Sequence, residues 1–170
     1  MIQELTALKK SILEQRYEDA LALIDDLEGM SKQAIIRNIE SYLDRLFIHL
    51  IKNQIEQRLT NSWAASIADS LRQIQKLNLK ANKQSYYLPQ NEWQDFLEEA
   101  LEAAITPASV EVLAGTLTPW QISEQINRPQ LLETAQTFIN LTYLHSKKEL
   151  PREINQQLAK LVGGEDWYQS

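Results

Sequence analysis

The chain has 170 residues, of which 44% are apolar and 24% are charged, and its formal net charge is −6. It contains no cysteine, which excludes a disulfide framework, an iron–sulfur site and a thiol nucleophile. With only four glycines and five prolines, the composition favours helices over an all-β fold, and the length suits one domain.

Apolar residues at helical spacing open the chain. They are Leu5, Leu8, Ile12 and Leu13 in residues 3–14, followed by Tyr17, Leu21 and Ile24. Gly29 tolerates the left-handed conformation that ends many helices. The opening therefore predicts an antiparallel helical hairpin that ends near Gly29.

A long helix is predicted for residues 31–59, with Ser31 as its N-cap. Its apolar positions are Ile35, Ile39, Leu43, Leu46, Phe47, Leu50, Ile51 and Ile55. At 100° per residue, residues 39–55 cover an arc of roughly 200°, wider than the stripe of a surface helix. We expect this helix to be the longest of the protein and to lie at its centre.

Further helices follow at shorter intervals. We predict helices at about residues 63–77, between Asn91 and Pro107, from Thr118 to Ile126, from Asn127 to Leu144 and from Pro151 to Leu161. Val110 and Val112 alternate with Glu111 as in a strand, but a strand without a partner is unstable, so a loop or short helix is expected there. The last residues, from Glu165, are interpreted as a tail.

The pattern predicts an all-α fold, a single-domain helical bundle of about six to eight helices with one long central helix. We divide residues 1–170 into a bundle of residues 1–126 and a C-terminal helical extension, residues 127–170, packed on it. The extension carries an apolar stripe that must be covered, and 44 residues without cysteine rarely fold alone.

One face of the long helix carries five polar or aromatic residues that stack along a line. They are Tyr42, Arg45, His49, Lys52 and Glu56. We take these five as candidate partner-binding residues, together with Trp167 near the C-terminus.

The stretch "IESYLDRLFIHLIKNQIEQRLTNSWAASIADSLRQI" resembles the core of the bacterial domain-of-unknown-function family twenty-nine, which is numerous in cyanobacteria. The resemblance lies in His49-Leu50-Ile51-Lys52, in Ser62-Trp63 and in the acidic residues before Gly29. It spans about residues 17–126. The family's usual aromatic N-terminal segment and a counterpart of residues 127–170 are not recognised. The resemblance implies a small helical bundle and no established reaction.

Arg45 and His49 are weak catalytic candidates. Histidine suits acid–base work near neutral pH, and arginine can hold a phosphate with two hydrogen bonds. Helical RNases that use an Arg–His pair have four to six intervening residues, whereas three separate these two. The alternative is structural, with His49 bonded to Glu56 or to a neighbouring helix.

Other chemistry has little support in the sequence. With only His49 and His145 present, no metal site and no cofactor are predicted. The four glycines form no phosphate-binding loop. We expect Trp63, Trp93 and Trp120 to lie in the core.

We therefore expect an uncharacterised helical interaction or regulatory module that binds a protein partner, with a homodimer as one form. An enzyme remains an open alternative. So does a nucleic-acid-binding or RNase-like protein that uses Arg45 and His49, although scattered lysines and a net charge of −6 disfavour nucleic acid. The longest apolar run has six residues and no signal-peptide pattern is evident, so no membrane association and a cytoplasmic location are expected.

Overall fold

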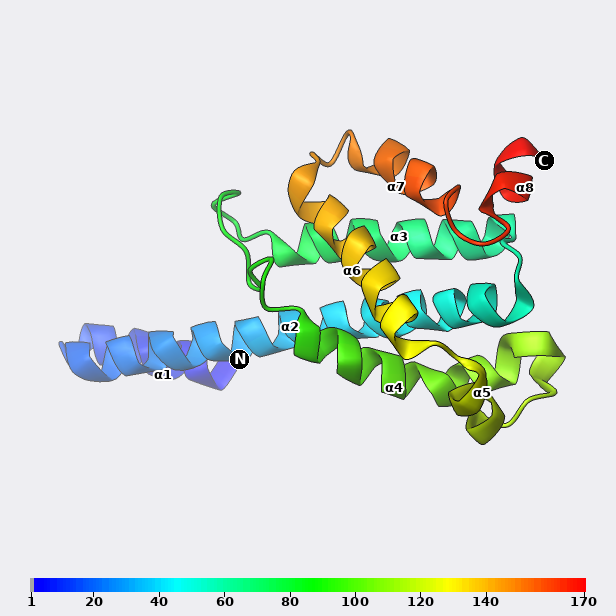
Figure 1. Ribbon diagram of the computed structural model, residues 1–170. Coiled ribbons are helices and arrows are strands. Elements are labelled where there is room, and N and C mark those ends of the chain that lie inside the picture. Colours follow the sequence, from blue (N-terminus) through cyan, green and yellow to red (C-terminus); the bar gives the residue numbers. More distant parts are fainter. Residues whose placement is uncertain (1) are drawn as a thin grey trace. The chain divides into compact units, whose positions relative to one another are not determined.

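A computed structural model describes residues 2–170, and these form eight α-helices, one 3₁₀-helix and no strand (Figure 1). The elements are α1 (Ile2–Leu13), α2 (Tyr17–Glu56), α3 (Asn61–Asn78), α4 (Gln94–Glu111), the 3₁₀-helix η1 (Val112–Gly115), α5 (Pro119–Gln125), α6 (Arg128–Leu144), α7 (Leu150–Leu158) and α8 (Gly164–Gln169). The predicted all-α fold class is confirmed.

None of the helices in residues 2–170 is by itself long and apolar enough to span a lipid bilayer. By length and composition alone, one pair meets that criterion together: residues Gln94–Gly115 with α5, which are bent by 92°.

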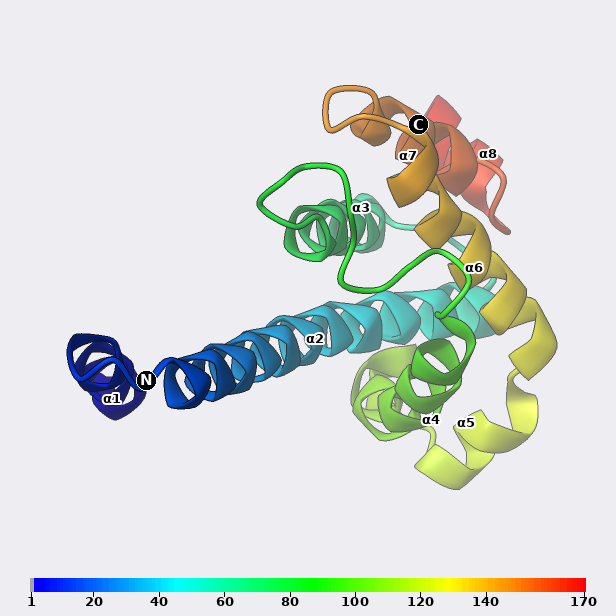
Figure 2. The ribbon, with the colours of Figure 1, turned by 90° about the vertical axis from the view of Figure 1, so that its left-hand side faces the viewer.

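The chain forms two compact units, one up to Asn38 and one from Ile39 onward, and α2 contributes to both. In the first unit α1 lies antiparallel beside the first half of α2 (Figures 1 and 2). Gln15, with a φ of 60°, makes the turn between the two helices. Arg16 stabilises this turn through ion pairs with Glu14 (2.9 Å) and Asp19 (3.0 Å). The predicted hairpin is therefore present.

The long helix begins earlier than predicted, because α2 runs unbroken for 40 residues from Tyr17. Gly29 does not end it, and Ser31 lies inside it without acting as an N-cap. A glycine inside a helix costs only about 1 kcal/mol relative to alanine. That cost is smaller than the loss of hydrogen bonds and packing at a break, so propensity is overridden. The predicted C-terminal end is nearly correct, since Gln57, with a φ of 56°, stops the helix after Glu56.

In the second unit the C-terminal half of α2 is covered by neighbouring helices. Its apolar residues Ile39, Leu43, Leu46, Phe47, Leu50 and Ile51 are at most 1% exposed. The helix α3 follows after a short turn, and Thr60 caps it by accepting a hydrogen bond from the Trp63 amide. The helix α6 packs against both α3 and α4, and α7 packs against α3 and α6 (Figure 1). This core explains the wide apolar arc of the central helix.

Tyr143 on α6 ties the long loop between α3 and α4 to the core. Its hydroxyl accepts hydrogen bonds from Trp93 Nε1 (2.6 Å) and from Asn78 Nδ2 (2.8 Å), and donates one to the Leu88 carbonyl. Asn78 Oδ1 in turn accepts from the Leu88 amide at 2.8 Å. Burial raises the pKa of Tyr143, whereas the bonds from Trp93 and Asn78 lower it.

Pro107 does not end α4, contrary to the prediction, and the helix continues to Glu111. Ala104, Ala108 and Val112 follow one another at intervals of four and are fully buried, so the helix gains core contacts by continuing. Pro107 and Ala103, whose carbonyl loses its usual donor, are both exposed, so water can replace the missing hydrogen bond.

Two further expectations need correction. Trp120 is 80% exposed and outside the core, because the two-turn helix α5 buries Ile122 and leaves position 120 on its other side. Residues from Glu165 are no tail, since they form most of α8. Gly163, with a φ of 72°, allows this: a Cβ atom there would lie 2.7 Å from Arg58 Cα.

Candidate functional site

The five residues of the predicted polar line on α2 do not form a solvent-exposed face. Lys52 is buried, and Tyr42, Arg45, His49 and Glu56 are half-buried. The hydrogen-bond and ion-pair partners of Arg45 and Lys52 come from α3 and from the end of α4, and those of Glu56 come from the turn after α2 and from η1. The line is therefore a packed polar seam between helices.

Arg45 binds α3. Its guanidinium makes an ion pair with Asp69 at 3.1 Å and donates a second hydrogen bond to Ser66 Oγ at 3.3 Å. Both nitrogens of its planar end are thus occupied by neighbours one helical turn apart on α3. The arrangement orients the arginine toward α3 and leaves less of its hydrogen-bonding capacity for an external phosphate.

Lys52 is the buried charge of the seam. Its Nζ lies 3.1 Å from Glu111 Oε1, and its side chain is 8% exposed, against 47% for Glu111. The same Nζ lies 4.9 Å from the centre of the Trp63 ring, a cation–π distance. Arg58 also lies over this ring, at 4.7 Å. The positive charge of Lys52 is therefore balanced within the bundle. It also interacts favourably with the negative C-terminal end of the α4 dipole.

Glu56 holds the sharp turn after α4. Leu113, Ala114 and Gly115 have successive φ values of 47°, 57° and 76°, a left-handed run that reverses the chain. Glu56 Oε2 accepts a hydrogen bond from the Leu113 amide at 3.2 Å, while Oε1 pairs with Arg58 at 2.9 Å. Both carboxylate oxygens of Glu56 therefore have partners other than His49. The predicted bond between His49 and Glu56 is not formed.

His49 has an unusual environment. Its Nδ1 atom is buried and has no hydrogen-bond partner among the described residues. The pKa of His49 is lowered from 6.5 to about 4. Burial is the largest cause, the positive charges of Lys52 and Arg45 act in the same direction, and the Glu111 carboxylate opposes them. The imidazole is neutral at pH 7 and is a poor proton donor there.

A nucleic-acid interface would need basic side chains such as Arg45, Lys52 and Arg58 to form one patch of unpaired positive charge. These three each have a carboxylate partner, namely Asp69, Glu111 and Glu56. Within residues 2–170, no three His, Asp or Glu side chains come close enough to share a metal ion. The seam therefore stabilises the contact between helices and offers little unpaired charge to a ligand.

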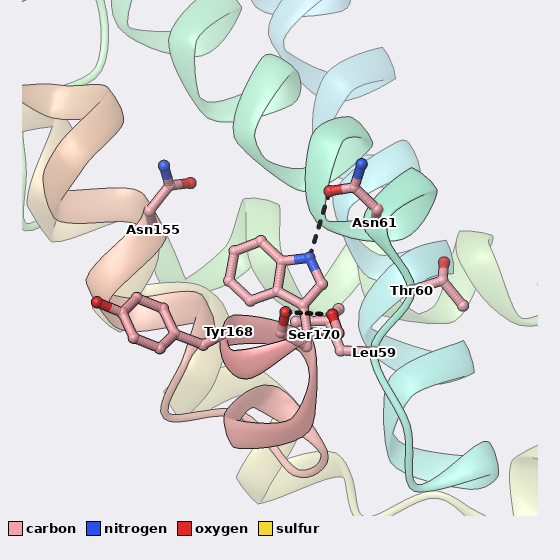
Figure 3. Close-up of a pocket in the computed structure, with 7 residues that line it drawn as sticks. Leu59, Thr60, Asn61, Asn155, Tyr168 and Ser170 are labelled. Carbon is pink, nitrogen blue, oxygen red and sulfur yellow. Dashed lines mark hydrogen bonds between the residues drawn. The ribbon is translucent and has the colours of Figure 1, made fainter.

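Trp167, the sixth candidate, lies at a pocket of about 580 Å³ near the turn between α2 and α3 (Figure 3). Its indole Nε1 donates a hydrogen bond of 3.4 Å to Asn61 Oδ1. The lining residues are Leu59, Thr60, Asn61, Asn155, Trp167, Tyr168 and Ser170. None of these seven residues has a carboxylate, imidazole or ammonium side chain. The pocket is separate from the α2 seam.

A different surface, on the first unit, was missed as a site. The sequence assigned Leu5, Ile12, Tyr17, Leu21 and Ile24 to the hairpin without asking which of them its two helices could bury. Their exposed fractions are 51%, 49%, 60%, 62% and 38%. The contact between the helices uses other residues, since Ser11 and Ala20 are buried and Leu8, Leu23 and Leu27 are half-buried.

The five exposed residues share one side of the hairpin. On α1, Leu5 and Ile12 are rotated by about 70–90° from the side that contacts α2, at 100° per residue. On α2, Tyr17, Leu21 and Ile24 are rotated by roughly 70–130° from their contact side, in the same sense. In an antiparallel pair, equal rotations bring both sets to the same side. We call these five residues the hairpin face.

The hairpin face is large for an unoccupied surface. Its side chains expose on the order of 500 Å² of mostly apolar area, at the upper end of the 300–600 Å² typical of the largest patch on a monomer. The signal was present in the sequence: the start of α2 carries one apolar stripe at Ala20, Leu23 and Leu27 and a second at Tyr17, Leu21 and Ile24. A single neighbouring helix covers only one of the two.

The comparisons with known proteins identify a family. A family model described as "Domain of unknown function DUF29" matches residues 2–133. The match includes the N-terminal hairpin and the start of α6, so it is longer at both ends than the resemblance in the sequence, and residues 127–133 do have a counterpart. No curated protein and no solved structure matches the chain.

Proposed function

The chain belongs to the DUF29 family, whose function is unknown, and we propose that it is a helical protein–protein interaction module that binds its partner through the hairpin face. The observation that carries the proposal is the exposure of Leu5, Ile12, Tyr17, Leu21 and Ile24 on one side of two packed helices. The largest apolar patch on a protein surface, when it reaches about 300–600 Å², is often a functional contact surface.

The polar seam supports an interaction module more than an enzyme. Its charges bind one another, and His49 has a pKa of about 4. Acid–base residues are instead tuned toward the working pH. The second unit accordingly has the features of a scaffold, while the first offers apolar surface to a partner.

The expected chemistry of the partner follows from the face. Helical side chains at the i, i+4, i+7 spacing of Tyr17, Leu21 and Ile24 fit between the ridges of another helix. Because the face spans two helices, an amphipathic helix could pack against both of them at once. We therefore expect a helical partner with an apolar stripe.

Affinity purification with the full-length chain tests this function. The wild-type protein and three variants, Leu21→Glu, Ile24→Glu and Leu144→Glu, are used as bait in native lysate. Leu144 on α6 is a matched control because it is 67% exposed, against 62% for Leu21, but lies in the second unit.

We expect a stoichiometric partner, another protein or the chain itself, that is retained by wild type and Leu144→Glu and lost by both hairpin variants. Far-UV circular dichroism verifies that the variants keep their helices. A partner that binds the hairpin variants as well as wild type, or the absence of any assembly, would refute the proposal.

A further inference from the structure

The hairpin face carries charges of both signs at its two edges, and this bears on what binds there. On α1, Lys9 lies between Leu5 and Ile12 on the same stripe, at i+4 from the first and i−3 from the second. On α2, Asp25 and Glu28 follow Leu21 at i+4 and i+7. One edge is therefore basic and the opposite edge is acidic. All three charged side chains are exposed.

The heights of these charges along the hairpin match. Because Ser11 and Ala20 are the buried positions of the antiparallel pair, and Leu8 and Leu23 are half-buried, Lys9 lies at the height of residue 22 of α2. Asp25 is then about 4.5 Å further along the axis, at 1.5 Å per residue. A lysine side chain spans that distance. A surface that carries complementary charges at the same height fits a copy of itself.

The area of the face also fits self-association. A standard interface contributes about 800 Å² per partner, of which roughly 65% is apolar in homodimers, or about 500 Å². The five side chains of the hairpin face supply an area of that order. A two-helix hairpin that pairs with its copy forms a four-helix bundle, in which each helix has two neighbours and both apolar stripes of α2 are covered.

Charge decides between the two symmetric arrangements of such a bundle. If the two-fold axis runs across the helices, α1 packs on α1 and α2 on α2, so the two basic edges face each other and so do the two acidic edges. If the axis runs parallel to the helices, each α1 packs antiparallel on α2 of the second copy. Lys9 then meets Asp25 and Glu28 of that copy, on both sides of the bundle.

We infer that the partner of the hairpin face is the hairpin face of a second copy of this chain, joined in an antiparallel four-helix bundle whose two-fold axis is parallel to the helices. This inference rests on the proposed interaction function and names its partner. The contact is isologous, as in most homodimers.

Analytical ultracentrifugation of the full-length chain from about 1 to 100 μM, the range in which modest interfaces associate, tests the stoichiometry. The expected mass is twice the 19.7 kDa of the chain. Leu21→Glu and Leu5→Glu, one on each helix, should both sediment as monomers with unchanged helicity, and Leu144→Glu should remain dimeric. A wild-type protein that is monomeric at 100 μM overturns the inference.

Charge reversal tests the arrangement. Lys9→Glu should weaken dimerisation about tenfold, because attraction becomes repulsion at two symmetry-related sites. The double variant Lys9→Glu/Asp25→Lys should restore most of the affinity, and high salt should reduce the difference between the variants. If Lys9→Glu leaves the affinity unchanged, or the double variant does not recover, the axis assignment is wrong.

The two proposals can fail separately. A monomeric wild-type chain that still captures another protein, lost by Leu21→Glu, would overturn the second copy as partner and keep the interaction function. A monomeric chain whose assemblies are all indifferent to the hairpin variants would overturn both.

Discussion

His49 should make the stability of the protein depend on pH between about 6.5 and 4. Burial lowers its pKa from 6.5 to about 4, because the bundle disfavours the charged imidazolium beside Lys52. In the unfolded chain the pKa returns to about 6.5. Between these values the unfolded state binds a proton that the folded state does not, so falling pH favours unfolding. The stabilising contribution of neutral His49 is complete above pH 6.5 and is lost as the pH falls toward 4.

The expected magnitude is about 1–2 kcal/mol. At 1.36 kcal/mol per pKa unit, the full shift corresponds to an upper bound of about 3 kcal/mol. Because His49 is only half-buried, screening by solvent reduces this bound. Urea unfolding at pH 7 and at pH 4.5 measures the loss as a difference in the free energy of unfolding.

The variant His49→Gln isolates the effect, because glutamine does not titrate. Between pH 7 and pH 4.5 the free energy of unfolding should fall in both proteins, and the fall in His49→Gln should be smaller than in wild type by about 1 kcal/mol or more. This comparison does not depend on how much the substitution itself destabilises the protein. The chain has one other histidine, His145, and His145→Gln serves as the control since it retains His49. Equal pH slopes in wild type and His49→Gln would refute the burial argument.

Two further substitutions test buried polar contacts. Glu111→Gln should lower the free energy of unfolding by about 1–2 kcal/mol, because it leaves the buried Lys52 ammonium without its carboxylate. The double variant Lys52→Met/Glu111→Gln should recover most of this loss in urea melts. A double variant as unstable as the single one would contradict the reasoning. Tyr143→Phe should lower the free energy of unfolding by about 1–3 kcal/mol, because Trp93 Nε1 loses its acceptor and the Leu88 carbonyl loses a donor. An unchanged thermal midpoint would contradict this and show that water replaces the hydroxyl.

The sequence predicted most helix starts because they depend on local chemistry. Thr118 and Asn127 cap α5 and α6 with their side chains, as expected from residue type and from the prolines that follow. Helix ends were less reliable. Gly29 and Pro107 both lie inside helices. Around Pro107 the burial of Ala104 and Ala108 outweighs the local preference, and at Gly29 the cost of about 1 kcal/mol is smaller than that of breaking the helical hydrogen bonds.

The candidate site was only partly predictable for the same reason. The stacking of Arg45, His49 and Lys52 follows from helical spacing, but their burial depends on partners that are distant in sequence. Lys52 meets Glu111, 59 residues away, and Arg45 meets Asp69, 24 residues away. No local pattern in one sequence indicates such pairs, so the spacing alone could not show which partners these side chains have.

The hairpin face was not predicted as a binding site for a related reason. A helical stripe in the sequence shows which residues need cover but does not show what covers them. In the second unit the cover is present: the stripe of α6, with Leu131, Ala135 and Phe138, is at most 3% exposed. In the first unit Leu21 and Tyr17 have the same spacing and remain largely exposed. An apolar stripe that the chain itself leaves uncovered is the best place to look for an intermolecular contact. The functional proposal therefore rests on the hairpin and not on the segment of α2 around His49.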